Sequence, residues 1–233
     1  LGRGPKGVDM ADLSTTYMGL RLRNPIIASS SRLTSTLDGV KSCVDAGAGG
    51  VVLASLFEEQ VMADTDKAIE EATFLTHTEA EDYCVALGRN HYMDRYFRLV
   101  ESAKKAVDVP VIASVNCITA ETWSEFAGGF ESAGADALEL NVFVLPSDPS
   151  RDGRSLEAHY RDVVSRVKAR VRIPVSLKIG FHFTGMAEVI SSLSRSGIAG
   201  LVLFNRFYRP DFDLEAMRLK PAPIYSSPEE MAI

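Results

Sequence analysis

The sequence predicts an α/β fold, a (β/α)8 barrel, because short apolar stretches alternate with amphipathic segments and each stretch ends in a polar residue. The stretches are 25–28, 51–54, 111–115, 137–140, 175–177 and 201–204, followed by Ser29, Ser55, Asn116, Asn141, Lys178 and Asn205. Continuous apolar runs of this length are typical of buried parallel strands. In a (β/α)8 barrel the C-terminal strand ends meet on one face, so these polar residues are expected to form one site.

Two local signatures recur at the boundaries of these stretches. Proline stands near the start of three strands, where its missing N–H costs least, and glycine follows three helices, where a left-handed C-cap is expected. The prolines are Pro25, Pro110 and Pro174, and the glycines are Gly47, Gly134 and Gly197. Their alternation predicts a chain built from repeated β/α units.

Apolar residues recur with helical spacing between the strands. The predicted helices are 36–46, 92–107, 120–133, 156–170 and 187–196. An open, doubly wound sheet is the competing fold, and it is disfavoured because no Gly-x-Gly-x-x-Gly follows the first strand. A complete barrel averages about 250 residues, and two β/α units are missing after the sixth. We therefore expect a barrel truncated after the sixth unit.

A chain of 233 residues with 46% hydrophobic residues is expected to form one domain. We assign that domain to residues 10–233 and interpret residues 1–9 as a vector-derived leader. The acidic region 56–90 is too long for a simple β/α loop and is expected to cover a ligand. Residues 211–227 are expected to form a small hairpin over the same face.

Composition excludes several classes of function. A net charge of −6 disfavours binding to nucleic acid, which requires a concentrated basic surface. The cysteines Cys43, Cys84 and Cys117 show no Cys-x-x-Cys spacing, and the histidines show no metal-ligand spacing, so neither a disulfide framework nor a metal site is expected. No apolar run reaches the ~18–20 residues of a membrane span. A cytoplasmic protein fits this composition best.

Lys178 stands near the end of a strand that is expected to be buried. Three interpretations compete. The amine could form a Schiff base with a carbonyl substrate, since desolvation favours its neutral form. It could lie beside a flavin ring and stabilise the anion formed on reduction. It could also pair with a nearby carboxylate such as Glu139.

Three asparagines, Asn116, Asn141 and Asn205, end three different strands. An amide donates and accepts hydrogen bonds at once, which suits the edge of a flavin or pyrimidine ring. The alternative is that each side chain bonds local backbone, as asparagine does in many loops. Ser29 and Ser30 offer small side chains and free N–H groups for the approach of a flat ligand.

At these residues the chain resembles the dihydroorotate dehydrogenase family, and more closely the dihydroorotate dehydrogenase-like proteins. The resemblance runs from Thr16 to the end and rests on 19–27, 134–141, 174–178 and 204–205. It implies a barrel that binds FMN and oxidises dihydroorotate to orotate in pyrimidine biosynthesis. The implied flavin-binding residues are Ser29, Ser30, Ser55, Asn116, Asn141, Lys178, Asn205, Ser226 and Ser227. The implied substrate-binding residues are Asn90, Asn141 and Asn205.

The chain departs from the family at two positions. The family's catalytic base, a cysteine or serine, is replaced by Val144, and a lysine expected near the end of the second strand is replaced by Ala54. Valine cannot accept a proton, so the base is unknown. The candidates to replace it are Ser147, Cys117 and His182. The units that hold the FMN phosphate in the family would lie beyond Ile233.

Three functions therefore stay open. The first is an FMN-dependent oxidoreductase that acts on the CH–CH bond of dihydroorotate or a related dihydropyrimidine. The second is a catalytically altered flavin-binding barrel that acts on another substrate or none. The third is a Schiff-base aldolase that uses Lys178. A small molecule is the expected partner in each case, and the resemblance allows a homodimer.

Overall fold

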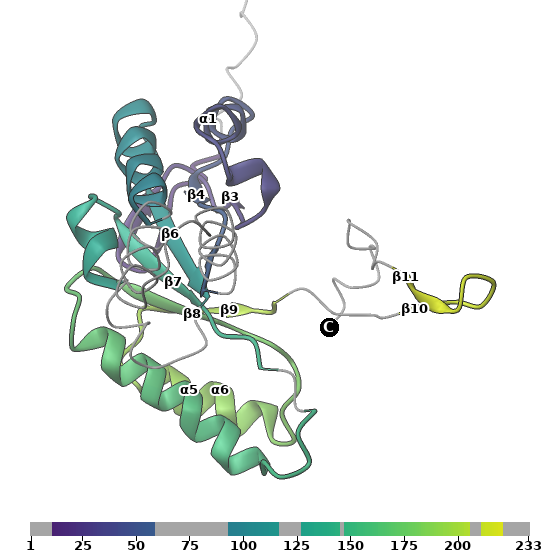
Figure 1. The fold of residues 1–233 in the computed structure, drawn as a ribbon. Helices are drawn as coiled ribbons and strands as arrows, with labels where there is room; N and C mark the ends of the chain where they lie inside the picture. Colours follow the sequence, from purple (N-terminus) through teal and green to yellow (C-terminus); the bar gives the residue numbers. More distant parts are fainter. Residues whose placement is uncertain (1–10, 59–92, 117–126, 145–146, 206–210, 221–233) are drawn as a thin grey trace, which may run out of the picture.

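A computed structural model describes the chain over residues 11–58, 93–116, 127–144, 147–205 and 211–220. Its centre is a parallel sheet of six strands with helices outside it (Figure 1). The strands are β3 (Ile27–Ala28), β4 (Gly50–Val52), β6 (Val111–Asn116), β7 (Ala137–Asn141), β8 (Val175–Ile179) and β9 (Gly200–Leu203). A further short strand, β5 (Leu56–Phe57), pairs with β6.

The strands follow one another in the sheet in the order of the sequence, β3-β4-β6-β7-β8-β9, and every pair is parallel. A doubly wound sheet would reverse its strand order at a switch point, whereas a (β/α)8 barrel adds each strand beside the last. The predicted fold class is therefore confirmed: the described residues form six consecutive strands of the (β/α) barrel type.

The helices begin where capping side chains satisfy free N–H groups. The side chain of Thr36 accepts a hydrogen bond from the Gly39 N–H at the start of α1 (Leu37–Asp45). Asp152 does the same for Ser155 at the start of α5 (Gly153–Lys168), which explains why this helix begins three residues before the predicted 156. The other helical segments are 93–106, 127–132 and α6 (Met186–Ser194).

The predicted helix ends are confirmed at the three glycines. Gly47, Gly134 and Gly197 have φ angles of 102°, 87° and 82°. These angles lie in the left-handed region that side chains with a Cβ rarely adopt. Each glycine turns the chain from a helix toward the next parallel strand, and β4, β7 and β9 each begin three residues after one of them.

Side chains alternate between the two faces of the sheet. Residues such as Val111, Leu138 and Leu177 point outward and pack with the helices in one large core, which contains Val163 of α5 and Leu193 of α6. This alternation leaves every second residue of β6, β7 and β8 on the inner face, where the barrel interior lies.

The N-terminal end of the interior is closed by a hairpin that the sequence did not predict. Strands β1 (Thr15–Tyr17) and β2 (Leu20–Leu22) pair antiparallel around Met18 and Gly19, both of which have positive φ. Met18 packs against Val52, Ile112 and Ala137 in a second, smaller core. Apolar side chains therefore fill this end of the barrel and leave the C-terminal strand ends for polar groups.

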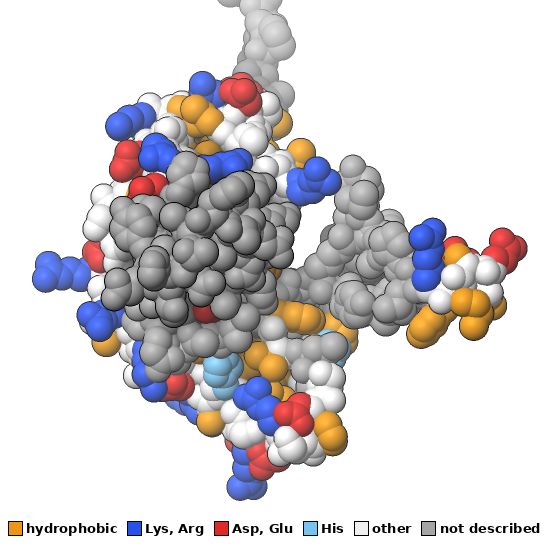
Figure 2. All heavy atoms as spheres, in the orientation of Figure 1, with side chains coloured by type: hydrophobic (Ala, Val, Ile, Leu, Met, Phe, Trp, Pro, Cys, Tyr) orange, Lys and Arg blue, Asp and Glu red, His pale blue; other side chains and the backbone are white. Residues whose placement is uncertain are grey.

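The predicted C-terminal hairpin is present, but its predicted position is wrong for the described residues. Strands β10 (Asp211–Asp213) and β11 (Arg218–Lys220) pair antiparallel. The hairpin lies apart from the sheet (Figure 1), and hydrophobic side chains are visible on its surface (Figure 2). Leu214 and Met217 are 82% and 85% exposed, so this turn does not pack over the strand ends. Nowhere in the described ranges does a helix combine the length and apolar character of a membrane span.

Candidate functional site

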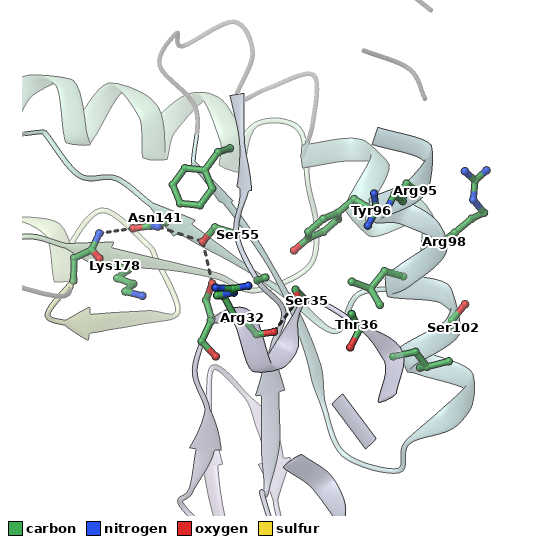
Figure 3. Close-up of a pocket in the computed structure, with 17 residues that line it drawn as sticks. Arg32, Ser35, Thr36, Ser55, Arg95, Tyr96, Arg98, Ser102, Asn141 and Lys178 are labelled. Atoms are coloured by element: carbon green, nitrogen blue, oxygen red, sulfur yellow. Dashed lines mark hydrogen bonds between the residues drawn. The ribbon is translucent and has the colours of Figure 1, made fainter. Parts of the chain in front are cut away.

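A pocket of about 780 Å³ opens at the C-terminal ends of the strands (Figure 3). Five residues that line it come from five different strand ends: Ser30 after β3, Ser55 after β4, Asn141 from β7, Lys178 from β8 and Asn205 after β9. All five belong to the predicted cofactor-binding set. The parallel sheet brings residues 175 positions apart into one cavity.

The sheet register explains how polar side chains reach the interior. Ser114, Glu139, Ser176 and Gly200 are paired across four neighbouring strands, and Asn141 and Lys178 are paired two residues further along. Positions two apart on a strand share a face. The barrel interior therefore changes from apolar at the N-terminal end, through a buried polar layer, to the asparagine and lysine of the pocket.

Hydrogen bonds join these side chains into one network. The Ser55 hydroxyl oxygen lies 3.0 Å from that of Ser30 and 2.8 Å from that of Ser114. The Asn141 amide donates to the Ser55 oxygen over 3.2 Å, and its carbonyl accepts from the Asn205 amide over 2.5 Å. Because the network crosses five strands, each member is held in place by its neighbours.

Tyr96, on the helix over 93–106, anchors the network from outside the sheet. Its hydroxyl donates to the carbonyl of Ser114 and accepts from the N–H of the same residue, both at 3.1 Å. Tyr96 also lines the pocket (Figure 3). The helix is thereby fixed against β6 at the level of the polar layer.

Glu139 and Lys178 form an ion pair beneath the pocket. The Lys178 Nζ lies 3.9 Å from Glu139 Oε1, and the two side chains are 13% and 5% exposed. The Ser114 hydroxyl also donates to Glu139 over 3.3 Å. Burial raises the pKa of Glu139, while Lys178 and the Ser114 hydrogen bond act in the opposite direction. The predicted pairing of Lys178 with Glu139 is therefore present.

Beyond the strand ends, the pocket runs between η1 (Arg32–Thr34), the start of α1 and the helix over 93–106. Arg32, Arg95 and Arg98 line this outer part, and none of them was predicted from the sequence. Ser114 was missed as well. Ser114 could have been predicted from the sequence, because it lies two residues before Asn116 on the same strand and must share its face.

The other residues predicted to form the site are not among the described residues that line the pocket. Ser29 is exposed, and Asn116 is the last residue of β6; neither is among the described residues that line the pocket. Asn90, Cys117, Ser226 and Ser227 lie outside the described residues. The roles assigned to these six residues stay predictions.

Two candidate bases and the valine at the family's base position fall within the described residues. Ser147 is exposed, and His182 packs beside the rings of Phe143 and Phe181, with a buried Nε2 that has no hydrogen-bond partner among the described residues. Val144 packs against the outer core, and its N–H donates to the Tyr160 hydroxyl over 3.4 Å. The described lining of the pocket includes none of the three.

A parallel sheet in sequential order, with a polar pocket at its C-terminal edge, defines a protein of the (β/α)-barrel class. Comparison with known proteins makes the class more specific: the chain is similar to dihydroorotate dehydrogenases over most of its length. It is 28% identical over 193 residues to the catalytic subunit of dihydroorotate dehydrogenase B (NAD⁺) of Thermoplasma volcanium, covering 80% of this chain and 60% of that protein. The resemblance inferred from the motifs is thereby confirmed.

Other relatives have related names. The catalytic subunit of dihydroorotate dehydrogenase B (NAD⁺) of Methanocella arvoryzae is 29% identical over 80% of this chain and 60% of its own length. The PreA subunit of NAD-dependent dihydropyrimidine dehydrogenase of Escherichia coli is 26% identical over 83% of this chain and 48% of its own. The chain thus spans about half to three-fifths of these relatives. No protein-family model matches it.

Solved structures give weaker likenesses. Dihydrodipicolinate synthase from Oceanobacillus iheyensis matches with a TM-score of 0.45 and 14% identity, over 78% of this chain and 53% of that one. An IMP dehydrogenase/GMP reductase-like protein from Corynebacterium glutamicum also has a TM-score of 0.45 and 14% identity, over 82% and 47%. Overlaps of this size support no conclusion about function.

Proposed function

We propose that the protein is an FMN-dependent oxidoreductase of the dihydroorotate dehydrogenase type, which acts on the CH–CH bond of dihydroorotate or a related dihydropyrimidine. The observation that carries this proposal is the convergence of Asn141, Asn205 and Lys178 on one pocket. The similarity to dihydroorotate and dihydropyrimidine dehydrogenases supports it. A cytoplasmic location and a homodimer stay predictions.

The groups that line the pocket fit a flavin. A flavin ring presents an edge of alternating carbonyl and N–H groups, and the amides of Asn141 and Asn205 can both donate and accept. We assign Ser30, Ser55, Asn141, Lys178 and Asn205 to the cofactor. When bound, FMN would supply the acceptor for the hydride that leaves the substrate carbon.

The chain's own residues would orient the ligand and balance its charge. The network through Ser55 fixes the direction of the Asn141 amide, because its carbonyl already accepts from Asn205. Lys178 provides a positive charge that is only 13% exposed, where electrostatic interactions are stronger than in water. Glu139 pairs with the Lys178 amine at 3.9 Å and so helps to hold it at the pocket.

A second candidate, a flavin-binding barrel with altered or no catalysis, is favoured by a specific observation. Oxidation of a CH–CH bond requires a base within hydrogen-bond reach of the proton that it removes. Val144 packs against the core, Ser147 is exposed, and the His182 Nε2 is buried. Among the described base candidates, neither Ser147 nor His182 lines the pocket. Cys117 lies outside the described residues and stays a prediction.

The aldolase interpretation receives less support. A Schiff base requires an amine that is free to attack a carbonyl, whereas the Lys178 Nζ forms an ion pair with Glu139 Oε1 at 3.9 Å. A nucleophilic role would also leave Asn141 and Asn205 without an evident function.

Titration with FMN, followed by quenching of flavin fluorescence, tests the proposal. We expect saturable binding, and we expect borohydride to trap no adduct between the protein and a carbonyl compound such as pyruvate. A protein that does not bind FMN would contradict the proposed function. A borohydride-stable adduct that maps to Lys178 would replace it with the aldolase. Lys41→Met, an exposed lysine on α1, is the control for loss of a lysine.

A further inference from the structure

The outer part of the pocket is positively charged although the chain carries a net charge of −6. Among the described residues that line the cavity, Arg32, Arg95, Arg98 and Lys178 are cationic, and none is acidic. A cavity wall of one sign concentrates ligands of the opposite sign. The pocket is therefore suited to a ligand that carries an anionic group.

Arg32 is an exposed arginine on a turn that local hydrogen bonds hold beside the strand ends. It begins η1, a turn closed by reciprocal bonds between Ser31 and Thr34: the Ser31 N–H donates to the Thr34 hydroxyl at 3.2 Å, and the Thr34 N–H donates to the Ser31 carbonyl at 3.1 Å. Thr34 is fully buried, and its carbonyl accepts from the N–H of Ala54 over 3.2 Å. The turn is thus tied to the end of the second barrel strand.

The Arg32 side chain is directed toward the site. In Figure 3 it extends toward Ser55, whereas the Arg98 side chain extends away from the strand ends. Within the described part of the chain, its guanidinium makes no hydrogen bond or ion pair. Arg23 differs, because its guanidinium donates to the carbonyls of Val44 and Ala48 and so has a structural role. The charge of Arg32 is available to a ligand.

The position of Arg32 is relevant to ligand binding because Ala54 also lines the pocket. The methyl group of Ala54 leaves space at the point where the resemblance leads us to expect a lysine. Arg32 lies on the turn whose Thr34 carbonyl accepts from the Ala54 N–H, and both Arg32 and Ala54 line the pocket. A guanidinium can hold a carboxylate through two parallel N–H···O bonds, which an ammonium group cannot do.

We propose that Arg32 binds the carboxylate, or a similar oxyanion, of a flat ring ligand and supplies from η1 the cation that Ala54 lacks. This inference rests on the proposed function, because it places the ligand ring beside the cofactor site of Asn141 and Lys178. Arg32 is then a specificity-determining residue: it selects pyrimidines that carry an acidic group over the same ring without one.

Calorimetric titration with orotate and with uracil tests this inference, since the two share a ring and differ in the carboxylate. Wild-type protein is expected to bind orotate more tightly than uracil. Arg32→Met is expected to weaken orotate binding by about tenfold or more, the usual loss for a charged hydrogen bond, and to leave uracil binding unchanged. Arg161→Met, an exposed arginine on α5, should alter neither.

A rescue variant separates this role from a structural one. Arg32→Met combined with Ala54→Lys returns a cation to the strand and is expected to recover the preference for orotate. Wild-type protein that binds orotate no more tightly than uracil would overturn the inference, as would equal losses for both ligands in Arg32→Met. Because the titrations need no flavin, failure of FMN binding would contradict the proposed function and leave the test of Arg32 intact.

Discussion

Replacing Lys178 with methionine is expected to lower the free energy of unfolding by on the order of 3 kcal/mol at neutral pH, because removing one member of a buried ion pair leaves the other uncompensated. The partner is Glu139, which is only 4% exposed. Lys41→Met removes an exposed lysine and is expected to have little effect. Urea unfolding of the three proteins measures the difference.

The effect of Lys178→Met should depend on pH in a defined direction. Burial already raises the pKa of Glu139 above its ordinary value of 4.5, and Lys178 acts against that rise. A group whose pKa is raised by folding contributes stability below its unfolded pKa and loses it as the pH rises through the folded pKa. Without Lys178 the pKa of Glu139 rises further, so the variant should lose stability relative to wild type as the pH rises through the wild-type pKa of Glu139, which lies above 4.5.

A second substitution tests whether the ion pair causes the loss of stability in Lys178→Met. Glu139→Gln removes the charge that Lys178 balances, so Lys178→Met should cost much less in that background. We expect the double variant to unfold at a similar urea concentration across this pH range and still to bind FMN less tightly than wild type. A loss of stability in Lys178→Met that is the same at acidic and alkaline pH would contradict the role of the ion pair.

Asn141→Ala is expected to reduce FMN affinity by about tenfold to a hundredfold, the range expected when polar groups in a pocket lose a partner. The substitution removes the donor to Ser55 and the acceptor for Asn205, so it disturbs three strand ends at once. Fluorescence titration with FMN measures the change.

Asn24→Ala is the matched control for Asn141→Ala. The Asn24 side chain also makes two hydrogen bonds: it donates to the Gly47 carbonyl and accepts from the Ile26 N–H, both at 2.9 Å, and it does not line the pocket. The Asn24→Ala substitution should lower the stability of the protein without changing its affinity for FMN. Equal FMN affinities for Asn141→Ala and wild type would show that the hydrogen-bond network does not contribute to FMN binding.

Periodicity predicted the parts of the fold that depend on burial. The apolar runs that became β6, β7 and β8 are buried on both faces, and the helices have one apolar face, so both patterns are visible in the sequence. The glycines at 47, 134 and 197 could be recognised because the left-handed conformation restricts the residue type. The β1–β2 hairpin has only three residues in each strand, which is too short for a clear pattern.

The site was predictable only where it depends on strand ends. Asn141, Lys178 and Asn205 could be grouped because parallel strands end on one face. Arg32 could not, because its position depends on the η1 turn and on the bond between Ala54 and Thr34, which connect residues 20 positions apart. Ser114 looked like part of an apolar strand, although the spacing to Asn116 places it inside the barrel.

The visible absorption spectrum of the FMN-loaded protein, recorded before and after anaerobic addition of dihydroorotate, tests the central claim most directly. We expect the flavin bands to bleach, because transfer of a hydride from the substrate reduces the flavin. Bands that persist in a protein that binds FMN would contradict the dehydrogenase activity and favour the flavin-binding barrel without this reaction.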